Sequence, residues 1–127
     1  MHVKKQTKTV IVVSAKRPEA ALEKEMDSRG IKLRWVRTIE GAARLLNSAL
    51  ERTIVVTELA LKDGNWRDLL EAVRSSQRFT PVLLVSSSST PELWWDALDC
   101  GVEDILADPL SSSRLCEYLE HSVHEDT

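Results

Sequence analysis

The sequence predicts an α/β domain in which a parallel five-stranded sheet is covered by helices on both faces. Five short apolar runs alternate along the 127 residues with five segments of helical periodicity. The runs at 9–13 and 53–57 are rich in β-branched residues, and only one helical segment separates each run from the next. This pattern is typical of parallel strands joined by right-handed crossovers. The length suits a single domain with one core and no further staples.

The five strands are expected at 9–13, 31–36, 53–57, 81–85 and 102–107. The first, third and fourth runs are largely apolar, as strands buried on both faces are. The run at 31–36 alternates apolar and polar residues, which indicates a half-exposed edge strand. Pro81 opens the fourth run, at a position where strands tolerate proline.

The five helices are marked by residues that favour helix ends and by apolar residues three or four positions apart. The residues expected at helix boundaries are Pro18, Ser28, Gly30, Thr38, Trp66, Ser75, Thr90, Pro91, Gly101 and either Ser111 or Ser112. The residues expected on the buried faces are Leu22, Met26, Ala42, Leu45, Leu46, Ala49, Leu69, Leu70, Val73, Leu93, Ala97, Cys100, Leu115 and Leu119.

Composition argues against several classes of function. The net charge of −3 does not favour nucleic-acid binding, which usually demands a basic face. No apolar run is long enough to span a bilayer, and the lysine-rich start lacks the apolar segment of a signal peptide. Residues 1–8 are expected to be a flexible basic tail. Cys100 and Cys116 lack metal-ligand spacing, and both are expected to be reduced thiols inside a cytoplasmic protein.

Four stretches together resemble the receiver domain of bacterial two-component response regulators. They are residues 10–13 with the following loop, 55–59 with Asp63 and Gly64, 80–86, and 97–110. The resemblance covers nearly the whole chain. It implies a flavodoxin-like (βα)5 sandwich with strand order 2-1-3-4-5, in a family that accepts a phosphoryl group from a histidine kinase onto an aspartate with the help of Mg²⁺.

The resemblance also implies a position for each part of the family's site. The two acidic Mg²⁺ ligands correspond to Ser14 and Ala15, and the phosphoacceptor aspartate corresponds to Glu58. The hydroxyl residue after the fourth strand is kept as Ser86. The lysine after the fifth strand corresponds to Asp108, and the aromatic switch residue corresponds to Ile105.

These replacements oppose phosphoryl transfer. Mg²⁺ sites for this chemistry are built from carboxylates, and most of the catalysis is neutralisation of the transferring group by metal and cation. The extra methylene of Glu58 moves its carboxylate by about an ångström, and misplacement on that scale is costly. The sequence therefore predicts a degenerate, phosphorylation-independent receiver (a pseudo-receiver) that has no enzymatic activity and no cofactor, and that acts as a protein-interaction or regulatory module.

The partner of the Glu58 carboxylate is left open by the sequence. As a mimic of the phosphorylated state, it would accept a hydrogen bond from Ser86. As a structural carboxylate, it would pair with a neighbouring cation, for which Lys16, Arg17 and Lys62 are candidates, with Lys16 filling the space left by Mg²⁺. A third possibility places Asp108 close enough to raise one of the two pKa values or to attract an adventitious cation.

An interface is expected on the helix at 91–100 and on the strand and helix that follow it. Trp95 should point away from the sheet, with Trp94 and Leu98 at its margin, and Tyr118 on the last helix. Exposed tryptophan is enriched at interface hot spots. The resemblance implies a histidine kinase, a downstream signalling protein or a second copy as the partner. The alternative is that both indoles fold against the domain edge and only cover Leu98 or Tyr118.

Two rival functions remain. Glu58 could still accept phosphate, or bind a metal together with Asp108. Alternatively, the pocket emptied at Ser14, Ala15 and Ser86 could bind a small ligand.

Overall fold

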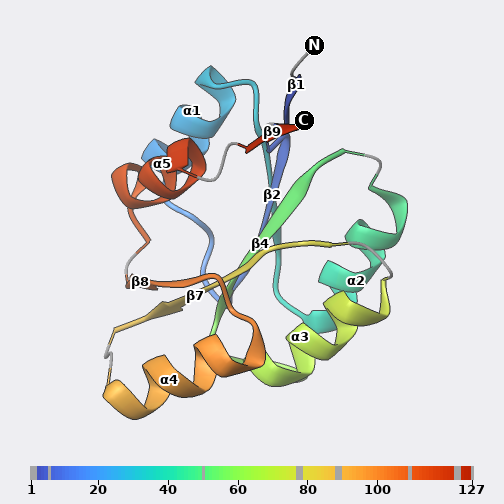
Figure 1. Ribbon diagram of the computed structural model, residues 1–127, viewed down its shortest axis with the longest axis vertical. Coiled ribbons are helices and arrows are strands. Elements are labelled where there is room, and N and C mark those ends of the chain that lie inside the picture. Colours follow the sequence, from blue (N-terminus) through green and yellow to red (C-terminus); the bar gives the residue numbers. More distant parts are fainter. Residues whose placement is uncertain are drawn as a thin grey trace.

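A computed structural model describes residues 3–5, 7–49, 51–76, 79–87, 90–108, 110–121 and 124–126. A five-stranded parallel sheet runs through its centre in the order β3-β2-β4-β7-β8 (Figure 1). These strands are β2 (Thr9–Val13), β3 (Lys32–Val36), β4 (Thr53–Glu58), β7 (Val82–Ser86) and β8 (Asp104–Ala107). Counted along the chain this order is 2-1-3-4-5, so the expected flavodoxin-like topology is confirmed.

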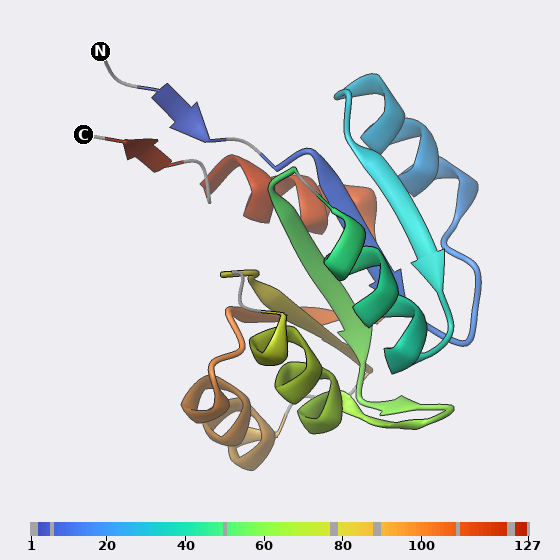
Figure 2. The same ribbon diagram turned by 90° about the vertical axis from the view of Figure 1, so that its right-hand side faces the viewer.

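Helices cover both faces of the sheet (Figures 1 and 2). They are α1 (Ala20–Ser28), α2 (Ile39–Ser48), α3 (Trp66–Ser75), α4 (Pro91–Cys100) and α5 (Ser112–His121). Buried residues of α2, α3 and α4 share one apolar cluster with the sheet, and those of α1 and α5 share the other. Each face of the sheet is therefore packed by its own group of helices.

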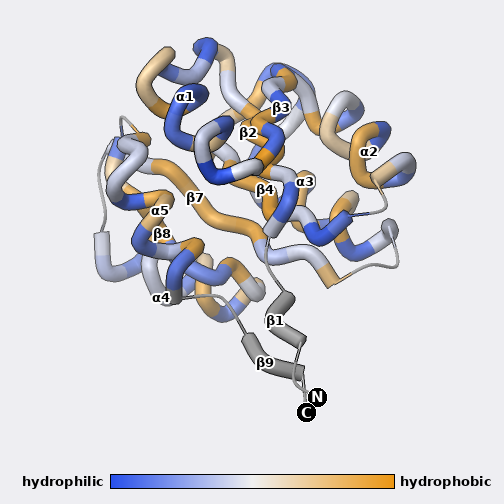
Figure 3. The backbone as a smooth tube through the Cα atoms, turned by 90° about the horizontal axis from the view of Figure 1, so that it is seen from above, coloured by the Kyte–Doolittle hydropathy of each residue, from blue (hydrophilic) through white to orange (hydrophobic). Residues whose placement is uncertain are grey.

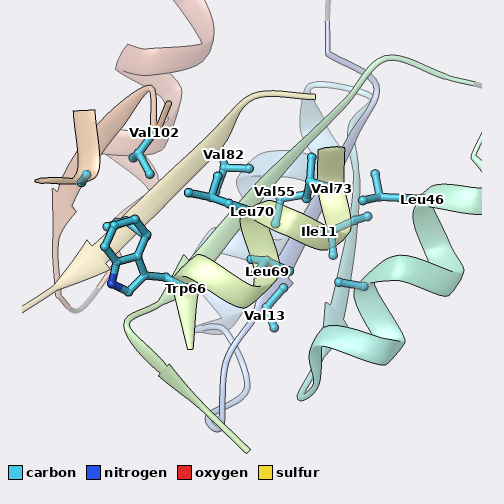
Figure 4. Close-up of a cluster of buried hydrophobic side chains, with 13 residues drawn as sticks. Ile11, Val13, Leu46, Val55, Trp66, Leu69, Leu70, Val73, Val82 and Val102 are labelled. Carbon is cyan, nitrogen blue, oxygen red and sulfur yellow. The ribbon is translucent and has the colours of Figure 1, made fainter. Parts of the chain in front are cut away.

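The sheet divides the core because neighbouring strand residues point to opposite faces. In β2, Ile11 and Val13 belong to the cluster beneath α2, α3 and α4, which Figure 4 shows, whereas Val10 and Val12 belong to the cluster beneath α1 and α5. All four are at least 95% buried. The continuous apolar runs of the central strands lie between these helix layers (Figure 3).

Local side chains fix where the helices begin and end. Thr38 accepts a hydrogen bond from the Gly41 N–H at 3.0 Å, and Thr90 accepts one from the Leu93 N–H at 3.1 Å. Both are the predicted N-caps. Gly101 ends α4 with a φ of 102°, the left-handed conformation that glycine adopts at little cost.

Two helix predictions are wrong. Pro18 does not open α1, which begins two residues later after Glu19, a cap residue whose side chain makes no capping hydrogen bond. Ala49 is not on the buried face of α2, because the helix ends at Ser48 and Ala49 has an extended backbone.

Short strands that the sequence did not reveal complete the fold. Within the expected tail of residues 1–8, β1 (Val3–Lys5) pairs antiparallel with β9 (His124–Asp126), so this segment is in part a strand (Figure 2). Lys8 donates its N–H to the Arg52 carbonyl at 2.9 Å. A small hairpin of β5 (Ala60–Leu61) and β6 (Gly64–Asn65) lies between β4 and α3.

None of the helices in the described ranges could cross a bilayer, since each is far shorter than a membrane span requires.

Candidate functional site

The candidate site lies where the parallel strands end, because the loops that leave these strands meet at one edge of the sheet. Glu58 is the last residue of β4, and Ser14 and Ala15 follow β2, the strand paired with β4. The Glu58 Oε1 atom accepts hydrogen bonds from the Ser14 hydroxyl and from the Ala15 N–H, the latter at 2.9 Å. The half-buried carboxylate therefore ties the end of β4 to the β2–α1 loop.

Ser14 is the centre of this network. Its hydroxyl accepts from the Lys16 N–H at 3.1 Å while it donates to Glu58. Its own N–H donates to the Val36 carbonyl, and its carbonyl accepts from the indole Nε1 of Trp35, both at 3.0 Å. The loop is thus held by β3 on one side and by β4 on the other.

Glu58 makes neither of the contacts that the sequence suggested. Ser86 is buried at the end of β7 and does not bond to the carboxylate, and within the described ranges no cation lies at ion-pair distance from it. The reason is the reach of the side chain. A glutamate at the end of β4 extends to a hydroxyl and a backbone N–H of the neighbouring loop.

A pocket of about 300 Å³ opens beside Glu58, on the α1–α5 side of the sheet. Its apolar wall includes Val12, Leu22, Val56, Val85 and Leu110, and its charged lining is Lys16, Arg17, Glu19, Glu58 and Asp108. Of the three residues expected to leave room there, Ser14 lines the pocket, while Ala15 and Ser86 do not.

Asp108 lines the same pocket as Glu58, but the two carboxylates make no hydrogen bond to each other. Asp108 is exposed and donates its backbone N–H to the Ser86 carbonyl at 3.1 Å. Where the resemblance places a lysine, the pocket has a carboxylate. Across the described parts of the chain, no three His, Cys, Asp or Glu side chains gather into a group that could hold a metal ion.

Asp63 is a second anchoring carboxylate, and sequence reasoning assigned it no contact. Its side chain accepts from the N–H groups of Ile39 at 2.8 Å and Glu40 at 3.2 Å, at the first turn of α2. The hydrogen bond from Ile39 is the main reason why the pKa of Asp63 lies below its ordinary value. The loop after β4 is therefore tied to α2 as well as to the β2–α1 loop.

The four predicted interface residues come from two helices, α4 and α5, which pack on opposite faces of the sheet. Trp94 and Trp95 are exposed on α4, at 42% and 66% of their surfaces, and their rings meet edge to face with centroids 6.2 Å apart. Leu98 is half-buried on the same helix. Tyr118 lies on α5, packed against the cluster on the opposite face of the sheet, and burial raises its pKa to about 12.

Ile105, at the expected switch position, is half-buried in β8 and packs against the cluster beneath α2, α3 and α4. The following residue, Leu106, is 1% exposed and belongs to the other cluster. At this position β8 contributes an aliphatic side chain that packs into the core.

Solved structures match this arrangement closely. A two-component response regulator from Clostridium difficile superposes with a TM-score of 0.77 at 22% identity, covering 91% of this chain and 94% of that one. The chemotaxis response regulator CheY4 of Vibrio cholerae gives 0.75 at 17% identity, covering 91% and 98%. The chain has the fold of a response regulator receiver domain. The beryllofluoride-activated NtrC4 receiver domain dimer gives a TM-score of 0.76 at 17% identity, covering 91% and 95%.

Sequence comparison agrees with this fold over part of the chain. The swarming motility regulation protein RssB of Serratia marcescens is 30% identical over 95 residues, which are 75% of this chain and 43% of RssB. The chain thus spans less than half the length of this curated relative. No family model matches the sequence.

Proposed function

We propose that this chain is a receiver module of two-component signalling that works without phosphorylation. It would act in the bacterial cytoplasm by binding proteins such as a histidine kinase, a downstream signalling protein or a second copy. The receiver fold and the likeness to RssB support the signalling assignment. The contacts of Glu58 support independence from phosphate.

The engaged carboxylate carries this proposal. Phosphoryl transfer needs the transferring group to be held in line beside the acceptor carboxylate by a metal ion and a cation. Oε1 of Glu58 instead accepts from the Ser14 hydroxyl and the Ala15 N–H, at the two positions where the family places its metal ligands. The carboxylate contacts the β2–α1 loop and thereby connects this loop to the end of β4. We infer that it contributes a fixed contact there.

We also infer that Mg²⁺ is no cofactor of this chain. The ion prefers carboxylate and water oxygens in near-octahedral geometry. A serine hydroxyl and an alanine methyl replace two carboxylates, and the hydroxyl already donates to Glu58. Asp108 adds negative charge where neutralisation of a phosphoryl group needs a cation.

Intact mass spectrometry after incubation with acetyl phosphate and Mg²⁺ tests the proposal. We expect the mass of the full chain to stay unchanged, both for the native protein and for Glu58→Asp, because a shorter carboxylate alone restores neither metal ligands nor a cation. A receiver domain that is modified under the same conditions serves as the positive control. A phosphate adduct on the native chain that disappears in Glu58→Gln would contradict the proposal.

A further inference from the structure

Acidic and basic residues are divided unequally between the two parts of the chain. Residues 79–127 contain ten acidic residues and one basic residue, Arg114, whereas residues 1–78 contain ten acidic and sixteen basic residues. The first group supplies β7, β8, α4 and α5, and the second supplies β3 at the other edge of the sheet. The β8 edge is therefore acidic, and a protein with this division of charge attracts basic partners to one side.

The outer face of α4 combines this acidity with exposed tryptophan. Glu92 lies three residues before Trp95 and Asp99 four residues after it, so the three side chains share one face of the helix, and all are exposed. Trp94 adjoins them through its edge-to-face contact with Trp95. We call Glu92, Trp94, Trp95 and Asp99 the α4 tryptophan face.

Glu92, in the first turn of α4, is placed favourably for the helix dipole, but Asp99, in the last turn, is not. Carboxylates near a helix C-terminus oppose the helix dipole, and the last turn of α4 has no basic residue. Asp96 is compensated by an ion pair with Arg67 of α3. Asp99 forms no ion pair with any residue that the structure describes. Its charge is available to a group from outside the chain.

The surroundings of Trp35 and Trp66 indicate which chemical group could bind to the exposed indoles of α4. The guanidinium of Arg37 lies 4.8 Å from the centre of the Trp35 ring, and that of Arg67 lies 5.0 Å from the Trp66 ring. Arginine is attracted to the electron-rich face of an indole and also pairs with carboxylates. Among the described residues, neither Trp94 nor Trp95 has a cation over its ring.

We propose that the α4 tryptophan face binds a basic peptide segment of another protein, whose arginine side chains stack on Trp94 and Trp95 and pair with Glu92 and Asp99. The inference rests on the proposed role as an interaction module and gives its partner a chemistry. A second copy could also approach this face with its basic β3 edge. Such a contact joins two different surfaces and would generate closed rings or open chains.

The probe is a synthetic amphipathic helix of arginine and leucine, titrated into the isotope-labelled full chain while the four indole N–H signals are followed by NMR. We expect the signals of Trp94 and Trp95 to shift with peptide concentration, while those of Trp35 and Trp66 stay in place. The same helix with glutamate for arginine should not bind. With lysine for arginine it should bind several-fold more weakly, because lysine lacks the planar guanidinium.

Two pairs of variants separate a specific face from general attraction to acid. Trp95→Ala should weaken binding by about tenfold or more, as loss of an interface hot spot does. Phe79→Ala is its control, since Phe79 is 83% exposed in the same acidic part of the chain but lies off α4. Asp99→Asn should weaken binding, whereas Glu117→Gln, at an exposed position of α5, should not. Equal effects within either pair would overturn the proposal.

Self-association is the remaining outcome. If the Trp94 and Trp95 signals shift with protein concentration alone, and Arg34→Glu on β3 abolishes the shift, the occupant is a second copy and the proposal is wrong. A result that contradicts the peptide-binding proposal can be distinguished from one that contradicts the proposed function. A phosphate adduct contradicts independence from phosphorylation, whereas absence of arginine-selective binding contradicts only the assignment of the α4 tryptophan face.

Discussion

Glu58 shows how a residue at the end of a strand can connect two loops of the fold. Its carboxylate accepts from Ser14 and Ala15 across the sheet edge, 44 and 43 residues away in sequence. Two donors from a neighbouring loop satisfy a half-buried carboxylate that has no cation at ion-pair distance in the described structure. We therefore interpret the residue as a link between the two loops that border the pocket.

Removing either side of this link should destabilise the fold. We expect Glu58→Ala to lower the free energy of unfolding by about 1–3 kcal/mol, since two donors lose their acceptor, and Ser14→Ala to lower it by about 1 kcal/mol. The double variant should be destabilised by less than the sum of the two single variants, because both substitutions remove the same Ser14–Glu58 hydrogen bond. Urea unfolding measures all three, with exposed Glu117→Ala as control. Simple additivity would show that the two residues do not interact.

Asp63 should make stability depend on pH in a defined direction. Its pKa is lowered in the folded state, so its stabilising contribution is present above the unfolded value of 3.8 and is lost as the pH falls through the folded value. We expect Asp63→Asn to reduce stability more at pH 7 than at pH 3. Asp27→Asn, at an exposed carboxyl group without a hydrogen bond from the described residues, is the control. A pH-independent difference for Asp63→Asn would rule out the linkage.

The sequence predicted the place of this site better than its contacts. Glu58 was expected at the end of a buried strand because 53–57 is a continuous apolar run, and β4 indeed ends there. Its partners could not be read, because one is a backbone N–H, which leaves no trace in residue identity. The contact between Asp63 and the N–H groups of Ile39 and Glu40 was missed for the same reason.

Among the elements, α3 and α1 show the two ways in which a helix begins in this chain. Asn65 accepts from the N–H groups of Arg67 and Asp68, and the Asp68 side chain accepts from the Asn65 N–H, which completes a capping box. Glu19, before α1, provides no such bond. The start of α3 is therefore fixed locally, whereas α1 depends on packing through Leu22 and Met26.

This contrast predicts unequal effects of the same substitution. Asn65→Ala should lower the free energy of unfolding by about 1 kcal/mol, the usual loss for a capping residue. Glu19→Ala, the matched variant at the other cap, should change it by less than about 0.5 kcal/mol. Thermal or urea unfolding provides the measurement. Equal losses would mean that the capping box adds nothing to stability.

Helices and strands were predicted well where the sequence shows a hydrophobic periodicity or a helix-capping residue. The bounds of β2 and α3 agree with the sequence because a β-branched run marks the first and the stripe of Leu69, Leu70 and Val73 marks the second. The hairpin β5–β6 and the strand pair β1–β9 were not predicted, since strands of two or three residues are too short to show a hydrophobic alternation. The predicted start of α1 at Pro18 was wrong because, in sequence, a proline two residues before a helix cannot be told from one in its first turn.

At the scale of the whole molecule, the sheet separates two cores that share no side chain. Ile11 and Val55 belong to the cluster beneath α2, α3 and α4, whereas Ile54 belongs to the one beneath α1 and α5. Each of these residues is at most 1% exposed. Packing on one face should therefore respond little to a small change on the other.

Double variants test this separation. Ile11→Val and Ile54→Val should each cost about 1 kcal/mol, and their combination should equal the sum within about 0.5 kcal/mol. Ile11→Val with Val55→Ala should depart from additivity, because these residues share one cluster and stand side by side in register. Urea unfolding of the single and double variants is the measurement. Strong coupling between Ile11 and Ile54 would show that the faces are not independent.

The hydrogen bonds between Glu58 and the β2–α1 loop have a consequence for how information could pass through this protein. A phosphorylated carboxylate stores a past event for as long as the bond survives. The hydrogen bond from Ser14 to Glu58 adds no covalent group, so nothing on the carboxylate marks an earlier event. Under the proposed function, the signalling output of such a module would therefore depend on its concentration in the cell. That concentration is set by the rates at which the protein is made and degraded.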